Sequence, residues 1–167
     1  DAFPLLEKPY FAYAPGRAPS NLEEAHSVLK DADGYVCVTP EYNHSPSPAL
    51  LNTLNHFGSS TFSFKPSAIG ECRRHIENLY DAVLCYFCRN VSYFCFLIPV
   101  TYSAGQWGGA RAGVALRTTL SELGCLPVSA MVHIPKAQEV FDRDGNVDTE
   151  HAEQWRKYCS RCFSQLE

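Results

Sequence analysis

The chain has 167 residues, which is enough for one domain with a substantial buried core. Hydrophobic residues make up 46% and charged residues 19%, and these values exclude a wholly disordered chain. The net charge of −4 argues against nucleic acid as a partner, because proteins that bind phosphate backbones carry a concentrated basic surface. The sequence starts at Asp1 with neither an initiator methionine nor a signal peptide, so we expect a fragment of a cytoplasmic protein.

The most apolar stretch runs from Ala82 to Val100 and is interrupted by Arg89 and Asn90. A charge at the centre of a membrane span costs about 2.5–3.5 kcal/mol, so a span here is possible but poor. We therefore expect no membrane contact.

Eight cysteines admit three interpretations. Without a secretion signal, reduced thiols in the cytosol are the default. Cys85 and Cys88 also have thioredoxin-like spacing, and together with Cys159 and Cys162 they could supply four thiolates to zinc. The latter two lie one helical turn apart, where ordinary core cysteines also occur. We expect no metal.

The first half of the chain predicts two helices around one strand. A capping box at Ser20–Glu23, in which Ser20 accepts from the backbone and Glu23 reaches back, begins a helix that ends near Asp33-Gly34. The apolar run 34–39 is typical of a strand buried on both faces of a parallel sheet. Ser47 is then expected to cap a second helix with Pro48 at its first position.

The second half continues the alternation. A strand begins at 65–69, stops, and resumes at 100–102. A helix over 110–123 is expected to end at Gly124, followed by a strand over 126–133 and a last helix capped by Thr149. Strands that alternate with helices predict an α/β fold with a mainly parallel sheet.

Two segments leave a strand and enter a helix, at the end of a parallel sheet where ligands bind. They are 39–45 (TPEYNHS) and 102–109 (YSAGQWGG). Glycines let a flat ligand approach, aromatic rings offer apolar faces, and amide and hydroxyl groups offer donors and acceptors. A planar heteroaromatic such as a flavin ring fits this lining. The same residue types also form ordinary turns, so a purely structural role stays open.

These two segments, with 49–55 (ALLNTLN) and the continuation to Ala112, resemble the NADPH-dependent FMN reductase family, which includes quinone, chromate and azo reductases. The likeness covers 1–69 and 100 to about 145. It implies that residues 1–167 form a single flavodoxin-like domain, a doubly wound parallel sheet with helices on both faces.

The resemblance also implies an oxidoreductase that passes hydride from NAD(P)H through FMN to a quinone-like or other small acceptor. No catalytic acid–base side chain is assigned, because the flavin carries the hydride chemistry. The family usually forms dimers or tetramers, so a homo-oligomer is expected. The positions that match its two ring-binding loops are Pro40, Glu41, Tyr42, Asn43, Ser103, Ala104, Gly105, Gln106, Trp107, Gly108 and Gly109.

The family's opening strand and phosphate-gripping loop have no counterpart in this sequence. The resemblance therefore implies that the first two strands and the first helix are missing, which removes the central strand from the order 2-1-3-4-5. Losing two hydrogen bonds to the phosphate costs about 3–6 kcal/mol, or two to four orders of magnitude in affinity. The alternative function is a non-catalytic fragment or splice product unable to hold FMN.

Residues 70–99 fall inside a strand of the family, whereas insertions prefer exposed loops. Gly70-Glu-Cys72 can be encoded with a splice donor, and Pro99-Val100 with an acceptor after pyrimidine-rich codons. Removing the segment joins Ile69 to Val100 and restores a continuous strand. We interpret 70–99 as a retained intron or another foreign insertion, and a genuine inserted helix and strand is the alternative.

Overall fold

The computed structural model describes residues 5, 7–32, 34–62, 68–69, 91–92, 96–147 and 152–166. The expected cap Thr149 lies outside these ranges. The elements are η1 Tyr10–Ala12, α1 Ser20–Asp31, β1 Gly34–Tyr42, β2 Ser45–Pro46, α2 Pro48–Asn55, α3 Ser59–Phe62, β3 Ala68–Ile69, β4 Val91–Ser92, β5 Phe96–Tyr102, α4 Ala110–Glu122, β6 Leu126–Pro127, β7 Val132–Ile134, α5 Ala137–Val140, α6 Ala152–Phe163 and η2 Ser164–Leu166.

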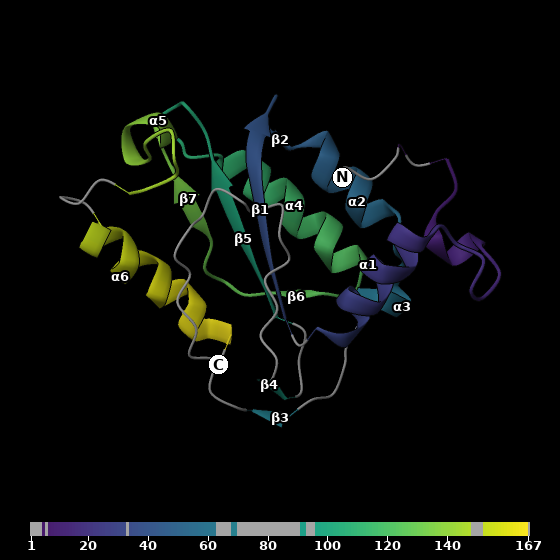
Figure 1. Ribbon diagram of the computed structural model, residues 1–167. Coiled ribbons are helices and arrows are strands. Elements are labelled where there is room, and N and C mark those ends of the chain that lie inside the picture. The colour runs from purple at the N-terminus through teal and green to yellow at the C-terminus, as the bar shows by residue number, and fades with distance from the viewer. Residues whose placement is uncertain are drawn as a thin grey trace.

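The main sheet is built on the parallel pairing of β1 with β5, from Gly34 opposite Phe96 to Pro40 opposite Tyr102. Strands β6 and β7 also run parallel to β5, while β2 pairs antiparallel with the end of β1 (Figure 1). The expected α/β fold with a mainly parallel sheet is confirmed. Among the described residues, no strand pairs with the edge of β1 that faces away from β5 between positions 34 and 40. The loss of the family's first strands stays a prediction.

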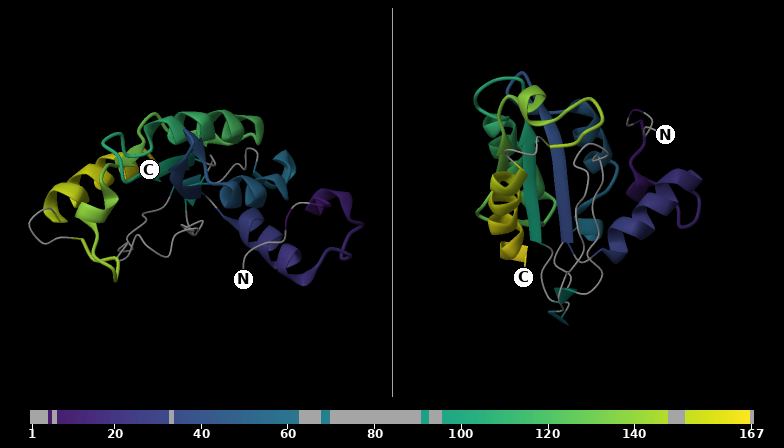
Figure 2. Two further views of the ribbon diagram at one scale, coloured as in Figure 1. Left: turned by 90° about the horizontal axis from the view of Figure 1, so that it is seen from above. Right: turned by 60° about the vertical axis from the view of Figure 1, so that its left-hand side comes forward.

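Helices cover both faces of this sheet, as expected. Alternate β1 residues such as Cys37 pack with Leu116 and Leu120 of α4, and those between them, such as Val38, pack in the cluster that contains Cys162 of α6. Figure 2 shows α4 and α6 on opposite sides of the strands. The period-2 alternation of a strand thus divides the core into two layers.

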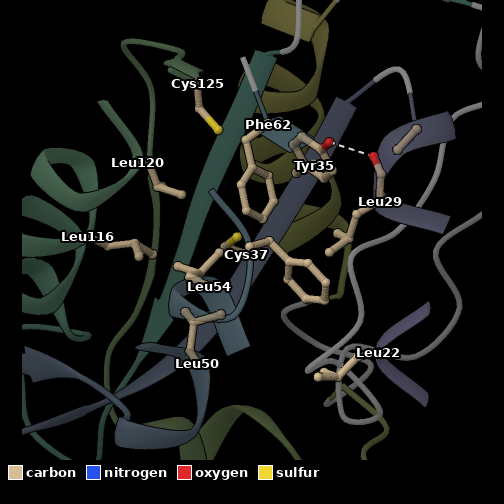
Figure 3. Close-up of a cluster of buried hydrophobic side chains, with 12 residues drawn as sticks. Leu22, Leu29, Tyr35, Cys37, Leu50, Leu54, Phe62, Leu116, Leu120 and Cys125 are labelled. Carbon is tan, nitrogen blue, oxygen red and sulfur yellow. Dashed lines mark hydrogen bonds between the residues drawn. The ribbon is translucent and has the colours of Figure 1, made fainter. Parts of the chain in front are cut away.

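The larger core lies between the sheet, α4 and the first three α-helices (Figure 3). Leu116 and Leu120 are fully buried in it, and burial of such a side chain contributes about 1.5–3 kcal/mol. The Tyr35 hydroxyl donates to the carbonyl of Leu29 at 2.7 Å, so the end of α1 is fixed to the start of β1.

The helix ends differ in part from expectation. The capping box at Ser20 is wrong, because Pro19 is the N-cap of α1 and has no side-chain acceptor. Glu23 still reaches back, but it accepts from the Ala18 N–H at 3.4 Å and from the Tyr10 hydroxyl at 2.9 Å. The Ser47 cap is confirmed by its bond from the Leu50 N–H at 3.3 Å.

The expected strand over 126–133 is divided into β6 and β7. The Arg117 guanidinium of α4 donates to the carbonyls of Pro127 and Val128. These carbonyls are therefore satisfied by a side chain, and the backbone can leave the sheet between the two strands without burying unpaired acceptors.

The strand expected to run from 65–69 into 100–102 is also arranged differently. Ala68 and Ile69 form β3, which pairs with β4 in a separate two-stranded sheet, and β5 starts at Phe96. Residues 96–99 of the suspected insertion thus supply four of the seven residues of β5. Buried Pro99 lies there opposite Cys37, although proline has no N–H for a ladder. This misfit supports a foreign origin for 70–99, which stays a prediction.

Deleting 70–99, so that Ile69 precedes Val100, is expected to keep the pairing of β1 with β5 and to raise the urea midpoint. Ile69 then takes the place of Pro99 and can donate one backbone hydrogen bond, a gain of about 0.5–1.5 kcal/mol. Pro99→Val in the full chain is the matched control and should recover a similar gain. A lower midpoint for the deletion, together with transcripts that always contain the segment, would identify 70–99 as an integral part of the protein.

Candidate functional site

The first candidate segment is a tight hairpin. Pro40, Glu41 and Tyr42 belong to β1 itself, and Asn43 and His44 form the turn to β2, with φ values of 51° and 63°. Two central residues with positive φ make a type I′ turn, whose twist matches the strands and which favours asparagine. The sequence predicted a loop here, but the structure shows a strand end and a two-residue turn.

Two buried threonines fasten the two candidate segments. Thr39 and Thr101 lie opposite each other in the pairing of β1 with β5, and both are fully buried. The Thr39 hydroxyl accepts from the Ser47 N–H at 2.9 Å, and the Thr101 hydroxyl donates to the Gly108 carbonyl at 2.8 Å. One pair of neighbouring side chains therefore holds both segments at the same end of the sheet.

The second candidate segment is held through its carbonyl groups. The carbonyls of Ser103 and Gly105 accept from the N–H groups of Ala137 and Lys136 at 3.0 and 3.1 Å. The Ala104 carbonyl accepts from the Gln138 side chain at 3.3 Å, so the loop lies against α5 at the top of Figure 1.

The Ser103 N–H donates to the Ile134 carbonyl at 3.2 Å, whereas the next four N–H groups of the loop have no partner among the described residues. These four groups belong to residues 104–107, which are exposed. Four successive backbone donors on exposed residues are therefore available to bind the acceptor edge of a ligand.

The glycines of this loop serve two different purposes. Gly108 and Gly109 are buried with φ of 57° and 78°, and a Cβ there would lie 2.7 Å from the Pro135 nitrogen or 2.8 Å from Thr101 Cβ. They permit the chain to pack against itself. A Cβ at Gly105 would meet only Ser103 Oγ, at 3.8 Å, so the space beside Gly105 is open.

Glu41 joins the hairpin to α4. Its Oε2 accepts from the N–H groups of Arg111 and Ala112, both at 3.2 Å, and its Oε1 lies 3.8 Å from Arg111 Nη1. The Arg111 guanidinium also lies 5.9 Å from the centre of the Trp107 ring. The two candidate segments therefore meet at the N-terminus of α4.

Large aromatic side chains are exposed at this end of the sheet. Tyr42 is 58% exposed and Trp107 59%, and Tyr102, the last residue of β5, is 38% exposed. Flat apolar faces beside unused backbone donors suit a planar heteroaromatic whose edge carries acceptors.

His133 lies beneath the second segment. Its Nδ1 is 2.7 Å from the Thr101 hydroxyl. Because that hydroxyl gives its hydrogen to the Gly108 carbonyl, we assign the hydrogen of the histidine to Nδ1. Burial lowers the pKa of His133, and the charge of Glu41 opposes this effect.

Sequence reasoning missed the residues that position the site, which are Thr39, Thr101, Arg111, His133 and Lys136. One signal was available for two of them: Thr39 is the first residue of the segment 39–45, and Thr101 directly precedes the segment 102–109. The other three act across distances that no local pattern shows.

Three earlier alternatives can be compared with the structure. Within the described ranges, no three His, Cys, Asp or Glu side chains are grouped to hold a metal ion. Burial raises the pKa of the Cys159 thiol to about 11, which disfavours the thiolate that zinc requires. Cys85 and Cys88 lie outside the described residues. Of the helices that are described, none has the length and apolar character that crossing a bilayer requires.

Replacing His133 by asparagine is expected to reduce the loss of stability in mild acid. The unfolded chain, with a histidine pKa of about 6.5, binds a proton more readily than folded His133, so this group destabilises the fold as pH falls below that value. Urea midpoints at pH 7.5 and pH 5.5 measure the effect. His44→Asn, at an exposed turn position, is the control, and an equal pH dependence in wild type and His133→Asn would contradict the assignment.

Comparison with solved structures finds the same fold in a flavoenzyme and in a second oxidoreductase. The flavoenzyme NAD(P)H:(acceptor) oxidoreductase FerB of Paracoccus denitrificans matches with a TM-score of 0.60 and 19% identity, over 96% of this chain and 75% of that one. An oxidoreductase of Corynebacterium diphtheriae matches with a TM-score of 0.54 and 15% identity, over 89% of this chain and 60% of that one.

Sequence comparison gives relatives and a family. An NADPH azoreductase of Bacillus sp. strain OY1-2 is 42% identical over 48 residues, 29% of this chain and 27% of the relative. An NAD(P)H-dependent FMN reductase of Pseudomonas aeruginosa is 30% identical over 139 residues, 81% of this chain and 58% of the relative. The chain thus spans less than two thirds of either curated relative. The model of the NADPH-dependent FMN reductase family matches residues 3–139, and the chain belongs to that family.

Proposed function

We propose that this chain holds the ring of FMN at the β1–β2 hairpin and the 103–109 loop, and passes hydride from NAD(P)H to a quinone-like or other small acceptor. Family membership supports the cofactor and the electron donor. The observation that supports the place is the run of unused N–H groups at 104–107, in a site with the exposed rings of Tyr42 and Trp107.

The residues present fit a flavin ring. When bound, the flavin supplies the hydride chemistry, and the protein binds and orients it. The N–H groups of 104–107 donate to the acceptor edge of the ring, and the space beside Gly105 admits it. The rings of Tyr42 and Trp107 cover apolar surface of the flavin ring, and the side-chain amide of Asn43 offers it a further hydrogen-bonding group. Pro40, Gly108 and Gly109 shape the backbone around these groups.

Neither of the two helices that begin beside the candidate site, α4 and α5, offers the FMN phosphate a comparable place. The N–H groups at the start of α4 are taken by Glu41, and those at the start of α5 are taken by the loop carbonyls. This observation favours a second candidate, a non-catalytic chain that holds FMN too weakly to act. A dimer or tetramer, as the family forms, is part of the first proposal.

FMN and riboflavin are expected to bind this chain with affinities within about threefold of each other, because the described site contacts only the ring. Quenching of flavin fluorescence measures both. Gly105→Val should weaken binding of both flavins about tenfold or more with an unchanged urea midpoint, because its side chain enters the open space and not the core. An absence of quenching at millimolar flavin would support the non-catalytic alternative.

Asn43→Ala is expected to weaken flavin binding and also to cost about 1 kcal/mol of stability, because alanine is strained at φ 51°. Asn43→Gly is the matched variant, since glycine adopts that φ freely and lacks only the amide. If the amide binds the ring, glycine keeps the stability and loses flavin affinity. Full affinity in Asn43→Gly would show that this position serves the turn alone.

A further inference from the structure

The carboxylate of Glu41 occupies a position that a ligand anion would otherwise favour. Both N–H groups that it binds, of Arg111 and Ala112, belong to the first turn of α4, whose N-cap Gly109 offers no side chain. The Glu41 side chain is only 11% exposed, while the nearby Arg111 side chain is 47% exposed. The cap is thus supplied from a different strand, 70 residues away along the chain.

Three effects favour this arrangement. The start of a helix carries partial positive charge and stabilises an anion there. Each N–H that donates to a carboxylate makes a charge-assisted hydrogen bond. The Arg111 guanidinium adds a second positive charge at 3.8 Å. With the site at the helix start filled by the protein's own carboxylate, a phosphate or carboxylate of a ligand is excluded from it.

We propose that Glu41 is a positioning residue, and that its carboxylate acts as an internal anion joining the hairpin to α4 and the 103–109 loop. Through Arg111 it also orders the Trp107 ring, which lies over that guanidinium. Its role in flavin binding rests on the proposed function, whereas its role as an internal anion does not.

The geometry separates this role from direct contact with a cofactor. An ionised carboxylate only accepts hydrogen bonds, and both Glu41 oxygens are directed to α4 groups. Only 11% of the Glu41 side chain is exposed, so little of it is available to a ring. The effect of Glu41 on a ligand therefore passes through the groups that it holds.

The test uses Glu41→Ala and Glu41→Gln in the full chain that also carries Trp155→Phe, so that Trp107 is the remaining tryptophan. Hydrogen exchange of the Ala112 amide should become about tenfold faster or more in Glu41→Ala, and Trp107 emission should shift. Glu41→Gln keeps an acceptor and should retain part of the protection. Glu139→Ala removes an exposed carboxylate paired with Lys136 and should change neither readout.

Added formate supplies the missing anion. It should slow Ala112 exchange and raise the melting temperature of Glu41→Ala, and should affect neither property in the wild type or in Glu41→Gln. A merely structural role for the glutamate side chain predicts no such rescue. If Glu41→Ala does not fold, hydrogen exchange of the Ala112 amide is measured in Arg111→Ala and in Glu41→Gln instead.

The outcomes decide between the two proposals. Unchanged Ala112 exchange in Glu41→Ala, or no response to formate, overturns the internal anion. Loss of flavin affinity with Ala112 protection intact also overturns it, because Glu41 would then contact the ligand directly while the proposed function stands. Fast exchange rescued by formate in a chain that binds no flavin supports the internal anion and rejects the proposed function.

Discussion

The parallel register of β1 against β5 is the constraint on which the candidate site depends. It sets Thr39 opposite Thr101. The Thr39 hydroxyl then accepts from the Ser47 N–H beyond the hairpin, and the Thr101 hydroxyl donates to the Gly108 carbonyl of the glycine-rich loop. A shift of one strand by one residue would move its threonine hydroxyl to the opposite face, against the aliphatic layer of Val38 and Val100. The hairpin and the glycine-rich loop are near each other because the two strands are paired in this register, and Glu41 of the hairpin can then cap α4.

The sequence allowed prediction of the fold class, the parallel sheet and the two candidate segments, because these depend on local apolar runs and turn residues. The Ser47 cap is of this local kind, and its prediction was confirmed. The Ser20 capping box failed because Pro19 begins α1 and Glu23 finds partners outside the helix. The bond from Glu41 to Ala112 could not be predicted, since it depends on how β1 and α4 pack and not on any local pattern.

The suspected insertion shows how a sheet can accept a sequence that does not suit it. Residues 96–99 make up four of the seven residues of the central strand β5, and Pro99 lies opposite Cys37 of β1 without an N–H to offer. The pairing continues because the register from Val100 to Tyr102 is supported on one side by β1 and on the other by β7. The strand is thus paired on both sides at each end, with β6 at Phe96 and Leu97 and with β7 at the carboxyl end that carries the candidate site.

The loop at 103–105 gives its carbonyls to the segment of α5, and the Trp107 carbonyl accepts from Ala110. Of the backbone groups of 104–107, the four N–H groups and only the Gln106 carbonyl then have no partner among the described residues, so the exposed backbone is rich in donors. A ligand edge of carbonyl oxygens or bare ring nitrogens satisfies it, whereas an edge bearing amino groups would set donor against donor, at about 1–3 kcal/mol for each group left unsatisfied. Because the backbone carries this discrimination, it persists whatever side chains occupy positions 104, 106 and 107, and it changes only when the loop leaves α5.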